Sequence, residues 1–279
     1  MNKKLYAVPL LSSALYSVWG ASITLALKLG TNVASLGLLV YFMASVLSLL
    51  FSIKRIFPPK KEWIFAGLIF ASANFILFNM ISGSYLSAAY IFLPSSILVF
   101  YLFTLEEIRQ KKSEKLRISF AVTVICLGMV VSQVSGPFLI NWFNLGLGLL
   151  ASFLYGVSSF LSASSTIAKR EMAETFWIVL LEITIFLPLS FITGLKISMN
   201  SAGFAATAAL CVSAGHYLEL LSYDRIKVQG GRFRLLNMIN VLTNFDIVFV
   251  AIASVFLGSF TVFSLIGLAL TFVGIVFFF

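Results

Sequence analysis

Three acidic side chains of this sequence lie inside long apolar stretches, where a charge is costly. They are Glu182, Glu219 and Asp246, and the other seven of the ten acidic residues lie in or beside basic segments. At the centre of a membrane a charge costs about 2.5–3.5 kcal/mol on insertion scales, so it is kept mainly where it faces a cavity or a partner. A carboxyl group in such a low-dielectric setting favours its protonated form, which suits it to carry a proton.

Other polar residues share helix faces with these carboxyls. His216, the only histidine, precedes Glu219 by three residues and is therefore expected one turn away on the same face. Four polar residues recur every three positions up to the third carboxyl: Asn237, Asn240, Thr243 and Asp246. Such a ladder favours a water-lined path. Structural alternatives stay open, namely pairing with a basic loop for Glu219 and hydrogen bonding between helices for His216 and Glu182.

Aromatic and amide side chains complete the candidate site. An aromatic face beside a carboxylate attracts an organic cation or the ammonium of a zwitterion, so these residues predict a site for an amine-bearing small molecule or a proton. The alternative for the aromatic and amide groups is an interfacial belt that packs helices together. The predicted binding residues are Asp246, Glu182, His216, Glu219, Asn240, Trp19, Tyr16, Tyr155, Tyr90 and Asn79.

Signatures of catalysis or of a bound cofactor are missing from the sequence. His216 and Glu219 form a lone H-x-x-E with no second histidine for a zinc pair, and no Gly-rich nucleotide loop occurs. Cys126 and Cys211 fall in separate apolar stretches and do not suggest a disulfide. We therefore expect no enzyme, no metal and no cofactor. Two other classes of function stay open as alternatives, namely a non-transporting membrane subunit and an intramembrane enzyme.

The composition places these residues in a membrane protein. Of the 279 residues, 60% are hydrophobic and 10% are charged, with a mean hydropathy of +1.05, far outside the range of soluble globular proteins. Apolar stretches of about 20 residues span a hydrocarbon core of ~30 Å as helices. The sequence predicts ten of them, at residues 5–27, 33–53, 63–81, 84–104, 116–134, 143–166, 174–194, 202–222, 234–257 and 260–278. The first is too long for a signal peptide and lacks a clear cleavage site, so we expect it to be retained.

Basic residues alternate from one connection to the next. The connections after the second, fourth, sixth and eighth stretches are basic, and 17 of the 19 Lys and Arg residues fall on the side of the N-terminus, leaving only Lys28 and Lys196 on the other. The positive-inside rule then places both termini in the cytoplasm, in a multi-pass protein of the cytoplasmic (inner) membrane. The basic loops orient the chain and contact anionic membrane lipid, so no nucleic-acid partner is expected.

The ten stretches form two sets of five. The first contains SALYSV (13–18) and the sixth SFLYGV (152–157), while VTVICLGMVV and LALTFVGIVF in the fifth and tenth carry Gly128 and Gly274 in the same register. The expected fold is therefore an all-α membrane protein of ten transmembrane helices, built from one repeat at 5–134 and a second at 143–278. Because five is odd, the second repeat enters the membrane from the opposite side and the repeats are inverted.

The sequence resembles the EamA-like branch of the drug/metabolite transporter superfamily over essentially its whole length. The resemblance rests on the two five-helix repeats, on SAAYIFLPSSILVFYLFTLEE (87–107) with Pro94 and a terminal acidic residue, and on the glycines near the ends of the fifth helices. The matching segment of the second repeat, 234–259, departs from this pattern, because it has no Pro and carries Asn240, Asn244 and Asp246 instead.

Membership of that family implies alternating access around a central cavity, energised by proton coupling or by exchange. The substrates of such carriers include amino acids and their derivatives, nucleotide sugars, quaternary amines and S-adenosylmethionine. From the resemblance and the candidate site together, we expect a secondary transporter for a small polar metabolite that bears an amine. We expect it to work as a monomer or a homodimer.

Overall fold

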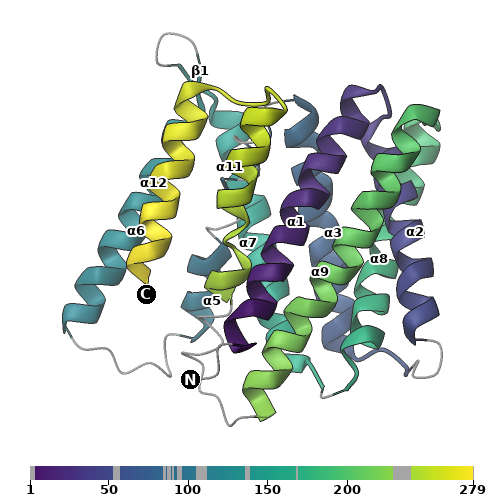
Figure 1. The fold of residues 1–279 in the computed structure, drawn as a ribbon, viewed down its shortest axis with the longest axis horizontal. Helices are drawn as coiled ribbons and strands as arrows, with labels where there is room; N and C mark the ends of the chain where they lie inside the picture. Colours follow the sequence, from purple (N-terminus) through teal and green to yellow (C-terminus); the bar gives the residue numbers. More distant parts are fainter. Residues whose placement is uncertain are drawn as a thin grey trace.

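The chain folds as a bundle of long α-helices in the computed structural model (Figure 1). The structure describes residues 4–52, 57–83, 86, 89, 91–92, 96–104, 112–135, 139–167, 169–228 and 240–278. The helices are α1 (Lys4–Lys28), α2 (Val33–Ser52), α3 (Lys61–Gly83), α5 (Ser96–Thr104), α6 (Lys112–Ser132), α7 (Trp142–Ser165), α8 (Glu171–Thr193), α9 (Ala202–Val228), α11 (Asp246–Phe256) and α12 (Val262–Phe278). The predicted all-α class is confirmed.

Several of these helices suit a membrane. Within the described residues, six are long and apolar enough to cross one, namely α1, α2, α3, α7, α8 and α9. Shorter apolar helices cover Leu116–Ser132, Asn240–Phe256 and Val262–Phe277. Eight of the ten predicted stretches coincide with one continuous helix, and the other two, 84–104 and 234–257, lie partly outside the described residues. The pattern is that of a multi-pass membrane protein.

Two helices differ from the prediction in ways that affect the carboxyls. α9 continues to Val228, six residues beyond the predicted stretch, so Glu219 lies about two and a half turns from its end instead of near it. The ninth stretch is interrupted by a turn that begins at Asn244, and α11 starts at Asp246. The side-chain amide of Asn244 donates to the Asn240 carbonyl oxygen at 2.7 Å, a local bond that competes with regular helix.

The connection between α6 and α7 is a small hairpin that the sequence analysis did not predict. Its strands are β1 (Val134–Ser135) and β2 (Leu139–Ile140), which pair antiparallel. Asn141 is the N-cap of α7, because its Oδ1 accepts from the backbone N–H of Asn144 at 3.0 Å. A short 3-10 turn, η4 (Met199–Ser201), precedes α9.

The helix contacts follow the division of the chain into two sets of five stretches. When each helix is replaced by the helix that lies five stretches away, the same contacts are found. α1 packs on α9 as α7 packs on α3, α1 contacts α11 as α7 contacts α5, and α2 contacts α9 as α8 contacts α3. α6 packs on its counterpart α12, and α2 on its counterpart α8. In Figure 1 the α6–α12 pair and the α2–α8 pair stand at opposite ends of the bundle, with α1 and α9 between them.

α6 and α12 approach each other closely at the two glycines of the sequence echo. A Cβ on Gly128 of α6 would lie 2.3 Å from the Thr271 hydroxyl, and a Cβ on Gly274 of α12 would lie 2.6 Å from Cγ1 of Ile125. Thr271 precedes Gly274 by three residues, as Ile125 precedes Gly128, so the contact is reciprocal. Small residues permit such close backbone approach between helices in lipid.

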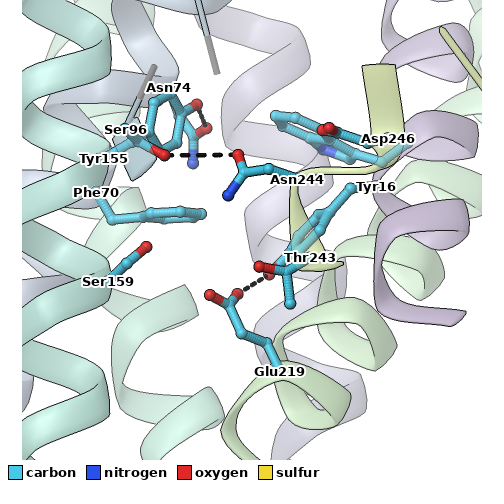
Figure 2. Close-up of a pocket in the computed structure, with 11 residues that line it drawn as sticks. Tyr16, Phe70, Asn74, Ser96, Tyr155, Ser159, Glu219, Thr243, Asn244 and Asp246 are labelled. Atoms are coloured by element: carbon cyan, nitrogen blue, oxygen red, sulfur yellow. Dashed lines mark hydrogen bonds between the residues drawn. The ribbon is translucent and has the colours of Figure 1, made fainter. Parts of the chain in front are cut away.

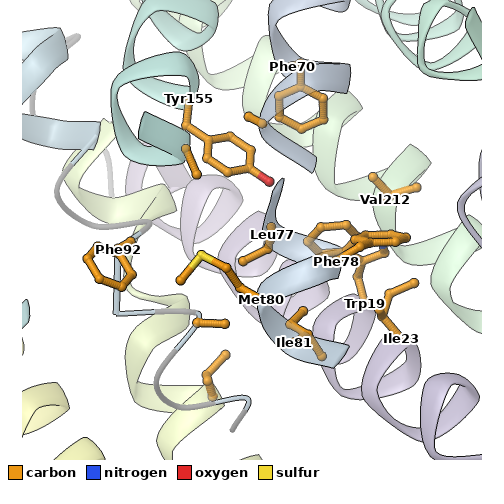
Figure 3. Close-up of a cluster of buried hydrophobic side chains, with 14 of the residues drawn as sticks. Trp19, Ile23, Phe70, Leu77, Phe78, Met80, Ile81, Phe92, Tyr155 and Val212 are labelled. Atoms are coloured by element: carbon orange, nitrogen blue, oxygen red, sulfur yellow. The ribbon is translucent and has the colours of Figure 1, made fainter. Parts of the chain in front are cut away.

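Buried aromatic rings fill the bundle beside α1 (Figure 3). The ring of Phe78 lies 5.7 Å from that of Trp19 and 5.5 Å from that of Phe186, and it stacks on Tyr41 at 6.1 Å. All four side chains are buried. Offset and tilted ring pairs of this kind add specific packing energy beyond area burial. The cluster fixes α1 against α2, α3 and α8, next to the candidate site.

Candidate functional site

A cavity lies in the middle of the bundle, between α1, α3, α7 and α9 and the starts of α5 and α11 (Figure 2). The free volume of the cavity is about 60 Å³. The lining residues are Tyr16, Trp19, Phe70, Asn74, Ser96, Tyr155, Ser159, Glu219, Thr243, Asn244 and Asp246. Sites in helix bundles are built in this way, from side chains of facing helices.

Tyr16 connects α1 to α9 through a network with an acidic end. Its hydroxyl donates to Glu219 Oε2 at 2.9 Å and contacts His216 Nδ1. A phenol has a single proton, so when Tyr16 donates to Glu219 it accepts from the His216 Nδ1–H. Tyr223 donates to Oε1 of the same carboxyl at 3.2 Å. Glu219 is thus held by two tyrosine hydroxyls while it lines the cavity.

Tyr155 connects α7 to α3 through a second network that also ends on a carboxyl. Its hydroxyl donates to Asn74 Oδ1, and Asn74 Nδ2 donates to Glu182 Oε1 at 2.7 Å. Glu182 is buried on α8, and its Oε2 has no hydrogen-bond partner among the described residues. The ring of Phe70 meets Tyr155 edge-on at 5.4 Å. Glu182 therefore lies one residue behind the cavity wall, with Asn74 in between.

α11 begins at the cavity wall at Asp246, and the described part of α5, which runs from Ser96, also reaches this wall. Asp246 and Ser96 each lie next to the residue that follows a tyrosine of the sequence echo. Ser17 Oγ donates to the Asp246 carbonyl oxygen at 3.1 Å, and a Cβ on Gly156 would lie 2.8 Å from the Ser96 carbonyl oxygen. A helix N-terminus carries partial positive charge, so the start of α11 favours a negative group nearby.

Asp246 supplies one such group. Its side chain is buried, and Oδ1 has no hydrogen-bond partner within the described residues. None of the eleven residues that line the cavity is basic. The cavity therefore combines two carboxyls, Glu219 and Asp246, with four aromatic side chains and several amides and hydroxyls. Such a lining attracts an ammonium group or a proton and repels anions.

The structure brings eight of the ten predicted residues into or next to the cavity. Tyr16, Trp19, Tyr155, Glu219 and Asp246 line it. Three lie one hydrogen bond behind the wall: His216 behind Tyr16, Glu182 behind Asn74, and Asn240, whose carbonyl accepts from Thr243 Oγ1 at 2.9 Å. Asn79 is exposed and donates to the Phe75 carbonyl of its own helix, outside the cavity. Tyr90 and Asn237 lie outside the described residues.

Six lining residues are not among the ten predicted binding residues. They are Phe70, Asn74, Ser96, Ser159, Thr243 and Asn244, of which Thr243 belongs to the polar ladder predicted from the sequence. Asn74 had a usable signal, because an amide deep in an apolar helix needs a buried partner in lipid. Phe70 and Ser96 had none, since one phenylalanine among 29 and one serine in an apolar run are not distinctive. Only packing identifies them.

Comparison with known proteins adds a fold and no family. No protein-family model matches the chain, and no curated protein sequence matches it. A solved crystal structure, described only as that of a protein, is similar with a TM-score of 0.68 and 14% sequence identity, covering 98% of this chain and 97% of the other. A likeness at that identity concerns the fold alone. It shows that the whole helical arrangement occurs in another chain of nearly the same extent.

Proposed function

We propose that the protein is a secondary transporter that moves a small, polar, amine-bearing metabolite across the cytoplasmic membrane by alternating access. The observation that carries the proposal is the central cavity, where Glu219 and Asp246 stand among four aromatic side chains and none of the described lining residues is basic. Carboxylates and aromatic faces together bind ammonium groups. Amino acids, simple amines and S-adenosylmethionine all carry such a positively charged group.

The architecture that we propose is ten transmembrane helices in two inverted five-helix repeats, as in the EamA-like transporters that the sequence resembles. The exchange symmetry of the helix contacts supports it, and so do the reciprocal contacts of Gly128 and Gly274 and the corresponding networks of Tyr16 and Tyr155. In a carrier, inverted repeats around one central site provide two related conformations, one open to each side of the membrane.

Substrate binding changes a contact between the two repeats in this mechanism. The hydroxyl of Tyr16, in the first repeat, donates to Glu219, in the second. An ammonium group that binds Glu219 competes with that hydroxyl, because the carboxyl oxygen then gains a stronger, charge-assisted partner. Asp246 has an oxygen without a partner among the described residues, which can hold a proton or a second polar group of the substrate.

The orientation that we propose has both termini in the cytoplasm. Its support is the charge distribution, with 17 of 19 Lys and Arg residues on the side of the N-terminus. Ser113 lies in the first turn of α6 and Ser135 just beyond its other end, so a membrane-impermeant thiol reagent should label single cysteines at these positions from opposite sides. Labelling of both from the same side contradicts the ten-helix arrangement. The native Cys126 and Cys211 are first replaced by serine or alanine.

Transport itself is tested with purified protein in liposomes. Saturable uptake of a radiolabelled amine, amino acid or S-adenosylmethionine, driven by a pH gradient or by counter-substrate and absent from empty liposomes, is the expected result. A thermal-shift screen chooses the compounds, because a ligand at 100 times its Kd adds about 2.7 kcal/mol to stability. Transport of anions or neutral sugars alone contradicts an amine substrate. Failure of every compound class to move contradicts a carrier.

A further inference from the structure

A groove runs along the outer surface of α1, between α9 and α11. Both neighbours pack against α1, and they leave one face of it uncovered. Its floor is the face of α1 from Ala14 to Leu25, which carries four Ala and Ser residues beside Val18 and Leu25, and its walls carry Phe204, Phe249 and Ile252. The free volume of the groove is about 410 Å³. Figure 1 shows α1 in this position between α11 and α9.

The corresponding positions of α7 carry larger side chains. The register of SALYSV against SFLYGV places Ala14 opposite Phe153, and the same register places Ala21 opposite Phe160. One position further along, Ser22 corresponds to Leu161. Both helices occupy the same place among their neighbours, so helix packing does not demand small residues there. The small side chains are therefore a feature of α1 and not of the repeat.

A cation stands at one end of the groove. Lys28 is the last residue of α1, one turn beyond Leu25, and its Nζ donates to the carbonyl oxygen of Leu257, directly after α11, at 3.0 Å. The side chain is exposed, and an ammonium group has two further protons to donate. Lys28 and Lys196 are the only basic residues assigned to that side of the membrane. A positive charge thus marks the place where α1 and α11 both end.

The length of the groove matches one leaflet of a bilayer. From Ala14 to Leu25 the helix rises about 16 Å at 1.5 Å per residue, and half of a hydrocarbon core of ~30 Å is about 15 Å. An acyl chain that lies along α1 therefore extends from the membrane midplane to its surface, and its headgroup arrives at Lys28. Val18 on the floor is 46% accessible and Ile252 on the wall is 53% accessible. The groove therefore faces the surroundings of the bundle and not the central cavity.

We infer that this groove is a binding site for one anionic phospholipid, with an acyl chain on the small-residue face of α1 and the headgroup phosphate on Lys28. The floor of the groove also contacts a residue that lines the central cavity. Ser17 lines the groove, and its hydroxyl donates to the backbone carbonyl of Asp246, a residue that lines the cavity. A bound lipid therefore packs against the helix start that carries the cavity carboxyl.

The test is lipid retention, measured by native mass spectrometry after the protein is extracted from nanodiscs that contain equal parts of phosphatidylglycerol and phosphatidylcholine. We expect one phosphatidylglycerol per protein, enriched at least about tenfold over phosphatidylcholine, since one contact with a charged group contributes about 1.5–3 kcal/mol. The double variant Ala14→Phe/Ser22→Leu, which copies the residues of α7, should retain no lipid. Lys28→Gln should retain a lipid without preference between the two headgroups.

Matched controls keep the result interpretable. Leu210→Phe adds a similar ring at an exposed position of α9 outside the groove, and it should retain lipid as the unmodified protein does. If Ala14→Phe/Ser22→Leu does not fold, the single variant Ala21→Leu and Lys28→Gln carry the test. Equal retention of phosphatidylglycerol by the filled variant and the unmodified protein overturns the inference. A protein dimer that the groove-filling change dissociates also overturns it, because the occupant is then a second copy of the chain. These measurements involve no transport, so they stand apart from the proposed function.

Discussion

Tyr16 and Glu219 are 203 residues apart in sequence, and the hydroxyl of one donates to the carboxyl of the other at 2.9 Å. The contact joins α1 to α9, which belong to different halves of the chain. Tyr155 makes the corresponding connection from α7 to Asn74 on α3. Each half therefore uses a tyrosine of its first helix to bind a polar residue on the third helix of the other half. The cavity lies between these two links.

The first prediction concerns the hydroxyl of Tyr16. Tyr16→Phe keeps the ring but removes the hydrogen bond to Glu219 Oε2 and the contact to His216 Nδ1. Leaving a part-buried carboxyl oxygen without this partner costs about 1–3 kcal/mol, so the melting temperature in detergent should fall. Tyr217→Phe, on the same helix as His216, is the control and should melt as the unmodified protein does. An unchanged melting temperature for Tyr16→Phe means that the network does not hold α1 to α9.

A second prediction concerns the buried amide of Asn74. Asn74→Leu preserves approximate size, yet it removes the partners of both Tyr155 and Glu182. Because a carboxyl and a hydroxyl lose their partners inside the bundle, we expect a loss of about 3 kcal/mol or more in the free energy of unfolding. Asn79→Leu is the matched control, since Asn79 is exposed on the same helix and its side-chain amide donates to the Phe75 carbonyl oxygen one turn earlier. Unfolding by denaturant, followed by circular dichroism, should separate the two variants clearly.

A third prediction concerns the close approach of α6 and α12. Gly128→Ala puts a methyl group 2.3 Å from the Thr271 hydroxyl and 2.7 Å from the Gly267 carbonyl oxygen, so the backbones must separate. Overpacking of this kind costs about 1–3 kcal/mol. Gly146→Ala, in α7 with open space around it, should be neutral or stabilising, because alanine favours helix by about 1 kcal/mol over glycine. If both variants unfold alike, the helices are not in close contact at Gly128.

Much of the fold could be predicted from hydropathy and charge. Hydropathy located the long helices because about 20 consecutive apolar residues in lipid have few alternatives to a helix. It misjudged the end of α9, since the polar residues after Ser222 continue the helix to Val228. It also missed the turn at Asn244. The side-chain bond from Asn244 to the Asn240 carbonyl, which accompanies this turn, leaves no mark in a sequence where polar residues recur every three positions as in a helix.

The site was predictable only in part, for a related reason. A charge in an apolar stretch is conspicuous, so Glu182, Glu219 and Asp246 were found from the sequence. Which of them lines the cavity depends on the rotation of each helix about its axis, which packing determines. Glu182 lies behind Asn74, whereas Glu219 and Asp246 line the space. Residues such as Phe70 line the cavity only because of how the helices pack, and no feature of the sequence distinguishes them.

The last prediction concerns Asp246, which we expect to be the pivotal ionisable group of the proposed carrier. It lines the cavity at the start of α11, its Oδ1 has no hydrogen-bond partner among the described residues, and no lining residue is basic. A carboxyl buried beside a cavity in a membrane carries a proton or attracts a cation more readily than one in water. Asp246→Asn keeps the size and much of the hydrogen bonding, so the variant should fold and reach the membrane while losing the ability to titrate.

Two measurements in liposomes then separate the possible roles of Asp246. If Asp246 carries the coupling proton, Asp246→Asn should lose accumulation against a gradient and the dependence of uptake on external pH, yet keep passive exchange of substrate. If Asp246 binds the amine, exchange should be lost as well, with at least a tenfold weaker apparent affinity, since a charged contact is worth about 1.5–3 kcal/mol. Glu62→Gln, at the first turn of α3 and outside the cavity, is the control and should transport normally. Unchanged affinity and pH dependence in Asp246→Asn would show that Asp246 is structural, and the same pair of measurements would then be made on Glu182→Gln and Glu219→Gln.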